Sequence, residues 1–125
     1  PILTLKYFSS LLAPGNSIYA KLSARVGSIS DNQKGGWYGY RASKAALNML
    51  LQTAAIELQR KNPHTSVVAL QPGTVRSKLS EPFTKAVPHL LEPEQSVAGM
   101  LKTLRNVKTK HGAQFLDYKG ESITW

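Results

Sequence analysis

Residues 36–48 read Gly-Trp-Tyr-Gly-Tyr-Arg-Ala-Ser-Lys-Ala-Ala-Leu-Asn and lead from a glycine-rich loop into a run of strong helix formers. No proline or glycine interrupts the chain from Arg41 to Arg60. Apolar side chains recur in this run at spacings of three and four residues, which predicts a helix with one apolar face. They are Leu47, Leu50, Leu51, Ala54 and Leu58. The stretch therefore predicts an amphipathic helix that packs on a core.

Strands are predicted on both sides of this helix. Residues 17–23 have the pattern of a strand, and residues 65–70 form a continuous β-branched and apolar run, which is typical of a buried parallel strand. The helix should end near Asn62, because a residue that precedes proline avoids helical dihedral angles. Two strands joined through a helix form a parallel crossover unit, so the sequence predicts an α/β fold.

The rest of the chain supplies further elements for such a fold. Residues 2–12 carry apolar side chains at helical spacing, and another helix is expected to open at Pro93, because proline is favoured in the first helical turn. A short strand is expected over residues 114–117 and an irregular segment over residues 78–92. The inner face of the helix that opens at Pro93 is predicted to consist of Val97, Met100, Leu101 and Leu104.

Length and composition limit the class of protein. A chain of 125 residues, 42% of them hydrophobic, forms one domain or part of one. The absence of cysteine excludes disulfides and thiol catalysis and fits a reducing compartment. No apolar run is long enough to cross a membrane, and no signal peptide is expected. His64, His89 and His111 lack metal-ligand spacing, so we interpret them as surface residues and expect no metal site.

The chain is strongly basic, with 16 Lys and Arg residues against 7 Asp and Glu, a formal net charge of +9. Such a balance is frequent among nucleic-acid binders. The charges are spread along the chain, however, and no aromatic residues are interleaved with the densest run, residues 102–111. We therefore interpret the charge as a solvated basic face and expect neither a nucleic-acid nor a membrane partner.

A tyrosine and a lysine stand four residues apart at the start of the predicted helix. Positions i and i+4 share a helix face, so Tyr40 and Lys44 bring a phenol and an ammonium side by side. A free phenol ionises at about pH 10, and a neighbouring positive charge favours its ionised form. Such a phenol can protonate a carbonyl oxygen while a hydride reaches the carbon. The motif is short, and the alternative is a surface tyrosine stacked over a lysine stem.

Further motifs before and after this pair favour a role of Tyr40 in proton transfer. Tyr-x-Ala-Ser-Lys-Ala-Ala-Leu at residues 40–47 resembles the active-site helix of the short-chain dehydrogenase/reductase family, and Pro-Gly-Thr-Val-Arg-Ser at residues 72–77 resembles the loop after that family's next strand. Ser-x-x-x-Gly-Ser-Ile at residues 23–29 is similar to a pattern in its carbonyl-reductase-like branch, which includes the C-factor and sniffer proteins. The resemblance covers essentially all 125 residues.

The resemblance implies a fold and an activity. The fold is the C-terminal half of a Rossmann-type, doubly wound parallel sheet, and the activity is NAD(P)-dependent reduction of a carbonyl by hydride transfer. Tyr40 would be the general acid, and Lys44 would bind the nicotinamide ribose and lower the pKa of the tyrosine. Residues 78–92 would form the substrate loop. The nicotinamide carboxamide would meet the turn that contains Pro72, Gly73, Val75 and Ser77.

The serine that orients the substrate carbonyl in this family is ambiguous here. The family commonly has Ser-Ser at the end of the strand before the loop, whereas this chain has Ser23 followed by Ala24. Ser28 stands twelve residues before Tyr40, close to the family's usual spacing, although the intervening loop looks lengthened. We favour Ser28 over Ser23. The remaining alternative is that neither acts and the loop backbone orients the substrate.

A second departure concerns the cofactor. The family binds the pyrophosphate at a Gly-x-x-x-Gly-x-Gly turn, and no such turn occurs in these 125 residues. We therefore expect residues 1–125 to be a single partial domain, the catalytic half, with the N-terminal dinucleotide-binding half absent. The strand over residues 17–23 would then lack a neighbour, and the chain would be poorly stable alone. The alternative function is a non-catalytic binding or signalling protein on a truncated reductase fold.

The remaining expectations concern ligands and assembly. The cofactor would be NADP or NAD, with NADP favoured, and the substrate would be a small carbonyl compound or alcohol. The protein is expected in the cytoplasm, with an organelle as the alternative. A homodimer could form through the helices over residues 2–12 and 40–61. Arg41 is predicted to point away from Lys44 toward the surface or a subunit interface. Trp37 and Tyr38 either line the substrate pocket or serve in packing.

Overall fold

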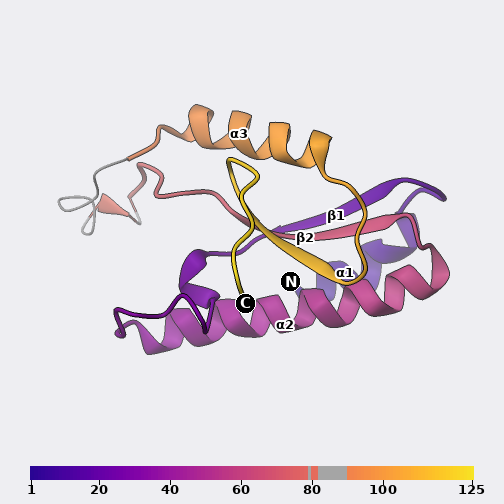
Figure 1. Ribbon diagram of the computed structural model, residues 1–125, viewed down its shortest axis with the longest axis horizontal. Helices are drawn as coiled ribbons and strands as arrows, with labels where there is room; N and C mark the ends of the chain where they lie inside the picture. The colour runs from indigo at the N-terminus through magenta and orange to yellow at the C-terminus, as the bar shows by residue number, and fades with distance from the viewer. Residues whose placement is uncertain (79, 82–89) are drawn as a thin grey trace.

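Three parallel strands form the sheet of this computed structural model, which describes residues 1–78, 80–81 and 90–125 (Figure 1). The strands lie in the order β1-β2-β3. In the register of the sheet, Ser17 pairs with Thr65, and Val67 pairs with Ala113. The strands are β1 (Ser17–Leu22), β2 (Thr65–Gln71) and β3 (Ala113–Asp117). The predicted parallel strands are therefore confirmed.

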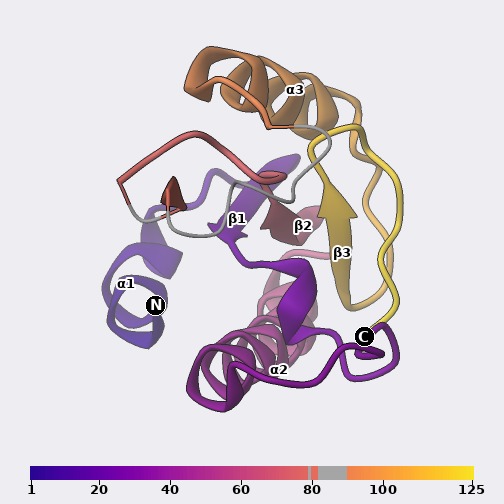
Figure 2. The same ribbon diagram turned by 90° about the vertical axis from the view of Figure 1, so that its left-hand side faces the viewer.

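Helices cover both faces of this sheet. The connection from β1 to β2 contains α2 (Tyr38–Lys61), and the connection from β2 to β3 contains α3 (Pro93–Asn106). Figure 2 shows α2 on one side of the strands and α3 on the other. Together with the parallel strands, these layers confirm the predicted α/β fold of Rossmann type.

The core lies in two layers, one on each face of β2. Val67 and Ala69 pack in the cluster that includes Leu47 and Leu51 of α2. Val68 and Leu70 point to the other face and pack with Leu116. Partly buried residues of α3 and Val107, which follows this helix, cover them. Both faces of β2 are thus covered, which explains why its sequence is continuously apolar or β-branched.

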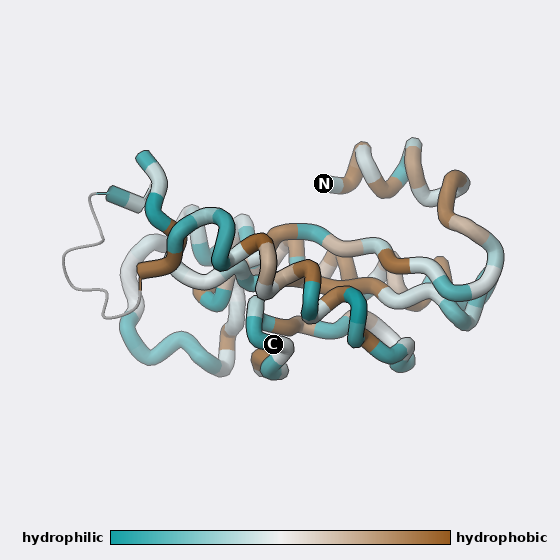
Figure 3. Tube along the Cα trace, turned by 90° about the horizontal axis from the view of Figure 1, so that it is seen from above, coloured by the Kyte–Doolittle hydropathy of each residue, from teal (hydrophilic) through white to brown (hydrophobic). Residues whose placement is uncertain are grey.

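The first helix is shorter than the apolar pattern predicts. α1 (Ile2–Phe8) is followed by a single 3₁₀ turn over Ser9–Leu11, whereas a helix was expected over residues 2–12. Leu12 is already extended, and Pro14 keeps its predecessor out of the helical region. Apolar positions recur along α1, seen at the N-terminal end of Figure 3, and none of its residues is buried.

The end of α2 agrees with prediction, because Asn62 leaves the helical region before Pro63. The predicted inner face of α3 is confirmed in part, because Met100 and Leu104 pack against the core on β2. Val97 and Leu101 were expected inside but are 48% and 47% exposed, whereas Ser96 and Thr103 are buried. On the side of Thr103, α3 contacts another element.

That contact is made by Gly99 and Tyr118. A Cβ on Gly99 would lie 2.7 Å from the carbonyl oxygen of Tyr118, so the helix approaches the chain after β3 on this side. The hydroxyl of Thr103 donates a 3.1 Å hydrogen bond to the same oxygen. The missing side chain of Gly99 and the hydroxyl of Thr103 thus place this side of α3 against Tyr118, which apolar periodicity alone could not predict.

Residues 79 and 82–89 of the expected segment 78–92 lie outside the described residues. Within the described ranges, each helix is too short or too polar to cross a lipid bilayer.

Candidate functional site

The predicted site residues gather where the strands end and α2 begins. Because β1 and β2 are parallel, their carboxyl ends lie at the same edge of the sheet, the edge at which open α/β sheets bind ligands. The start of α2 lies at this edge, and the turn after β2 leaves from it (Figure 1). The topology therefore brings Tyr40 and Lys44 to the same end of the molecule as Pro72 and Gly73.

Tyr40 and Lys44 are in contact. Nζ of Lys44 lies 5.8 Å from the centroid of the Tyr40 ring. The same Nζ donates a 3.1 Å hydrogen bond to the carbonyl oxygen of Leu22, the last residue of β1. Burial lowers the pKa of Lys44, because desolvation disfavours the charged form. Tyr40 is 47% exposed, so its phenol can be reached from solvent.

Polar groups of α2 also hold the segment that follows β1. Gly27 lies so close to Lys44 that a Cβ on the glycine would be 2.7 Å from the lysine's carbonyl carbon. Asn48, one turn further along the helix, donates to the carbonyl oxygen of Gly27 at 3.4 Å. Asn48 also accepts a 2.6 Å hydrogen bond from the hydroxyl of Ser23. The segment is therefore fixed on the same helix that carries the Tyr40–Lys44 pair.

Both candidate serines are buried, and their hydroxyls have different partners. Ser23 gives its proton to Oδ1 of Asn48. Oγ of Ser28 accepts a 3.0 Å hydrogen bond from the backbone N–H of Asp31 and lies 3.4 Å from Oγ of Ser30. The proton of Ser23 is thus committed to α2. The contact of Ser28 with Ser30 is longer and therefore weaker.

The turn after β2 is held tightly. Gly73 has a φ of 80°, which glycine adopts freely, and a Cβ there would lie 2.7 Å from Leu91. The carbonyl oxygen of Pro72 accepts a 2.6 Å hydrogen bond from the hydroxyl of Ser96, near the start of α3. Val75 pairs with Leu91 in a parallel bridge. The predicted cofactor-binding turn is therefore fixed on both of its sides.

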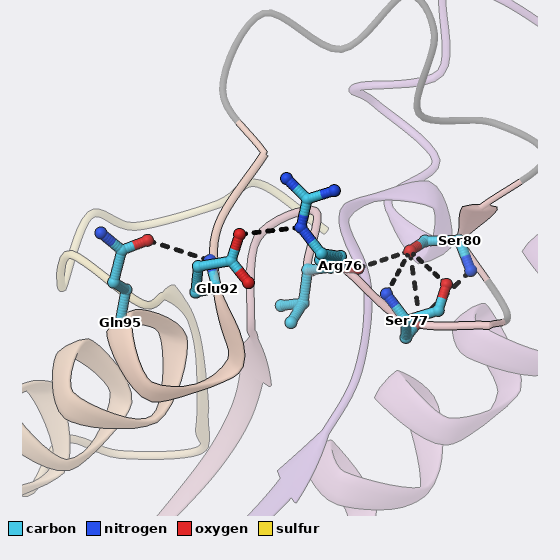
Figure 4. A network of polar contacts seen from close by, with 6 residues as sticks. Arg76, Ser77, Ser80, Glu92 and Gln95 are labelled. Atoms are coloured by element: carbon cyan, nitrogen blue, oxygen red, sulfur yellow. Dashed lines mark hydrogen bonds and ion pairs between the residues drawn. The ribbon is translucent and has the colours of Figure 1, made fainter.

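Side chains strengthen the same region (Figure 4). Nε of Arg76 lies 2.8 Å from Oε1 of Glu92, and the backbone N–H of Glu92 donates to Oε1 of Gln95 at 2.9 Å. The hydroxyl of Ser77 donates to Oγ of Ser80 at 3.1 Å. The ion pair thus ties the turn to the start of α3, and the Ser77 hydroxyl, predicted to meet the cofactor, is engaged within its own turn.

The entry to α2 has a left-handed backbone. Gly35, Gly36 and Trp37 have successive φ values of 62°, 69° and 51°. Glycine adopts this region freely, but a residue with a side chain does so at a cost of roughly 1–2 kcal/mol. The chain is therefore strained at Trp37, three residues before Tyr40.

Arg41 makes contacts that the sequence did not indicate. Its guanidinium donates hydrogen bonds to the carbonyl oxygens of Gly35, Gly36 and Val26. The predicted surface or subunit-interface role of Arg41 stays a prediction, whereas these hydrogen bonds to the loop were not predicted. Arg41 thus joins α2 to the loop in front of it.

Asn48 and Gly27 had no predicted role. Asn48 did carry a signal, because it stands between Leu47 and Leu51 on the apolar face of the helix, and a buried amide there needs a partner. The contact of Gly27 with Lys44 depends on the docking of two elements, so no pattern in the chain indicates it. Among the residues described, no group of three or more His, Cys, Asp or Glu side chains could hold a metal ion.

Similar sequences are found among known proteins. A family model described as short chain dehydrogenase matches residues 25–88. The chain is 35% identical over 106 residues to the C-signal of Myxococcus xanthus, a match that covers 85% of this chain and 60% of that protein.

Solved structures give the same result. A Burkholderia multivorans protein assigned to the short-chain dehydrogenase/reductases, with bound NADP, has a TM-score of 0.83 at 29% identity and covers 100% of this chain and 51% of its own. The NADPH-bound carbonyl reductase from chicken fatty liver has a TM-score of 0.71 at 32% identity, over 87% of this chain and 43% of its own. The chain thus spans about half the length of the proteins it matches.

Proposed function

The chain belongs to the short-chain dehydrogenase/reductase family, and we propose that it forms the catalytic half of an NAD(P)-dependent carbonyl reductase. The observation that carries this proposal is the contact between Tyr40 and Lys44 at the carboxyl edge of the sheet. A phenol that solvent can reach, with an ammonium over its ring, is suited to give a proton to a substrate oxygen. The likeness to an NADPH-bound carbonyl reductase supports the same reaction.

Proton transfer would run from the phenolic oxygen of Tyr40 to the oxygen of the substrate carbonyl. Negative charge develops on the phenol as its proton leaves, and the nearby ammonium of Lys44 stabilises that charge. The hydrogen bond from Lys44 to Leu22 keeps the ammonium in place. In alcohol oxidation, the reverse reaction, the phenolate would accept the proton.

A serine hydroxyl would orient the carbonyl for this transfer. We assign this role to Ser28, because the proton of Ser23 is already donated to Asn48, whereas the contact of Ser28 with Ser30 is long at 3.4 Å. Ser23 is the alternative. It would have to release Asn48 before it could donate to a substrate.

A nicotinamide cofactor, with NADP favoured over NAD, would supply the hydride. The chain fits the nicotinamide end of such a cofactor, because the ammonium of Lys44 has two further N–H groups for ribose hydroxyls and the left-handed Gly73 shapes a narrow turn at the same edge. The carboxamide would bind at the turn from Pro72 through Val75, with Ser77 after rearrangement of its hydroxyl. The pyrophosphate would be held by residues outside these 125, as expected for a partial domain.

A second function is favoured by one observation of another kind. One relative is named C-signal, which refers to signalling. A binding or signalling protein could keep the fold without catalysis. The intact Tyr40–Lys44 pair argues for the enzyme, because binding alone requires neither group.

Replacement of Tyr40 by Phe in the complete natural protein tests the proposal. The rate of NADPH-dependent reduction of small carbonyl compounds should fall by about 100-fold or more, because the change removes the proton donor and leaves the ring. Tyr38→Phe is the matched control, since Tyr38 lies two residues away and is 86% exposed. It should retain its rate.

Full activity in Tyr40→Phe would contradict the assigned chemistry. A titration of NADPH and then NADH, followed by nicotinamide fluorescence, separates the two functions. Saturable binding by the complete protein with carbonyl reduction supports the reductase, whereas no binding of either cofactor supports the non-catalytic alternative.

A further inference from the structure

The loop in front of α2 ends in three left-handed residues, Gly35, Gly36 and Trp37. Only two helical residues separate this segment from Tyr40. The side chain of Tyr40 is about half exposed, so packing holds it only in part. The place of its phenol therefore depends on the backbone at the start of α2.

One side chain fixes that backbone. Nε of Arg41 donates to the carbonyl oxygen of Gly36 at 3.0 Å, and Nη2 donates to that of Gly35 at 3.0 Å. Nη1 donates to the carbonyl oxygen of Val26 at 3.3 Å. The planar fork of a guanidinium presents several donors at fixed angles, which a lysine cannot reproduce. Arg41 thus binds both ends of the loop over residues 26–36.

The backbone of Arg41 takes part in the same arrangement. Its N–H donates a 2.9 Å hydrogen bond to the carbonyl oxygen of Trp37, which closes the first turn of the helix. Tyr40 precedes Arg41 directly, so it lies within the turn that this bond closes. Side chain and backbone of one residue therefore connect the strained entry to the helix that carries the phenol.

The charge of Arg41 has no acidic partner among the residues described. Asp31, the acidic residue in the same loop, lies 3.3 Å from Arg25 instead. Hydrogen bonds from an ionised donor are stronger than neutral ones, so the guanidinium holds these main-chain carbonyls firmly. The contacts of Arg41 therefore indicate a role in geometry.

We propose that Arg41 is a positioning residue for the reaction, which holds the left-handed entry to α2 and thereby the phenol of Tyr40 against Lys44. The proposal rests on the proposed reductase function. Arg41 would not touch the substrate. It would act through the carbonyl oxygens of Val26, Gly35 and Gly36.

Kinetics of Arg41→Ala and Arg41→Lys in the complete natural protein test this role. We expect kcat to fall about 10- to 100-fold in Arg41→Ala, because small displacements of a catalytic group have effects of that size. The KM for NADPH should stay within about twofold, since binding groups are untouched. Arg41→Lys should recover only part of the rate. Arg60→Ala, an exposed arginine near the end of α2, is the control and should behave as the wild type.

Chemical rescue distinguishes a positioning role of the guanidinium from a general loss of stability. Guanidinium chloride, far below denaturing concentrations, should raise kcat of Arg41→Ala several-fold, because the ion can occupy the place between the carbonyl oxygens. Ammonium chloride at equal ionic strength should not. Rescue by both salts would indicate a general charge effect and would overturn the proposal.

Trp37→Gly provides an independent test of the left-handed entry. Glycine favours the φ that Trp37 adopts, so the kcat lost in Arg41→Ala should be smaller when both changes are combined. If the fold-losses in kcat of the two single variants simply multiply in the double variant, the link between Arg41 and this backbone is overturned. A change in the KM of Arg41→Ala for NADPH with an unchanged kcat would also overturn the proposal.

The outcome also separates this proposal from the function on which it rests. If Tyr40→Phe abolishes carbonyl reduction and a folded Arg41→Ala does not slow it, only the positioning role fails. If Tyr40→Phe keeps the full rate, the proposed function fails whatever Arg41 does. Thermal unfolding of each variant shows whether it is folded. If Arg41→Ala does not fold, Arg41→Lys takes its place in the kinetic test.

Discussion

Lys44 carries its charge in a partly buried place, and this affects stability. Burial lowers its pKa in the folded state, whereas the unfolded chain titrates near the ordinary value of 10.5. Below the folded pKa the residue is charged in both states, and the cost of burial is present in full. Above the unfolded pKa it is neutral in both states. The contribution of Lys44 to the free energy of unfolding therefore rises with pH between the two values.

Chemical denaturation at a series of alkaline pH values can measure this effect. The free energy of unfolding of the wild type should increase relative to that of Lys44→Met as pH rises toward 10.5. Lys61→Met, at the exposed end of the same helix, should show no such change relative to the wild type. Identical pH dependence of all three proteins would contradict the assigned burial of Lys44.

At the scale of elements, the docking of the segment after β1 on α2 makes the site. Gly27→Ala should destabilise the protein by about 1–3 kcal/mol, because the new Cβ meets helix backbone that cannot move aside. It should also slow catalysis, since Ser28 follows directly. Denaturant unfolding measures the first effect and carbonyl reduction the second.

Gly39→Ala is the matched control for that change. Gly39 lies in the first turn of α2, and a Cβ there would meet nothing within 4 Å. Alanine should be neutral or stabilise the helix by up to about 1 kcal/mol. Equal stability of Gly27→Ala and the wild type would show that the two elements can separate without cost.

Patterns within one element were sufficient for much of the fold. The i, i+4 spacing predicted that Tyr40 and Lys44 meet, and the β-branched run predicted the buried β2. Contacts between elements were not predictable in this way. The orientation of α3 depends on Gly99 against Tyr118, and that of Arg41 on the dihedral angles of a loop. The roles of the site residues stay predictions, because they depend on ligands that no local pattern contains.

At the scale of the whole molecule, apolar surface remains uncovered on one side. Leu3 and Phe8 of α1 are 64% and 58% exposed, and Ile18 and Leu22 of the edge strand β1 are exposed as well. A surface of this kind marks an interface or an aggregation hazard. Either a second copy, as in the predicted homodimer through residues 2–12 and 40–61, or another part of the protein would cover it.

The purified 125-residue chain should therefore self-associate. Size-exclusion chromatography with light scattering should give a mass above 13.7 kDa that rises with concentration. Leu3→Glu combined with Phe8→Glu should shift it toward the monomer, whereas Val97→Glu, exposed on α3 across the sheet, should not. A strictly monomeric wild type would contradict this expectation.

The register of the sheet has a consequence for the path by which the chain folds. Each strand pairs with residues about 50 positions away, so both rows of interstrand hydrogen bonds close long loops. α2 can form from local contacts alone, but β2 has no partner until distant segments arrive on both of its sides. Folding should therefore be slow for a chain of this length. The amides of β2, enclosed last and most completely, should be those that exchange their hydrogens most slowly with solvent.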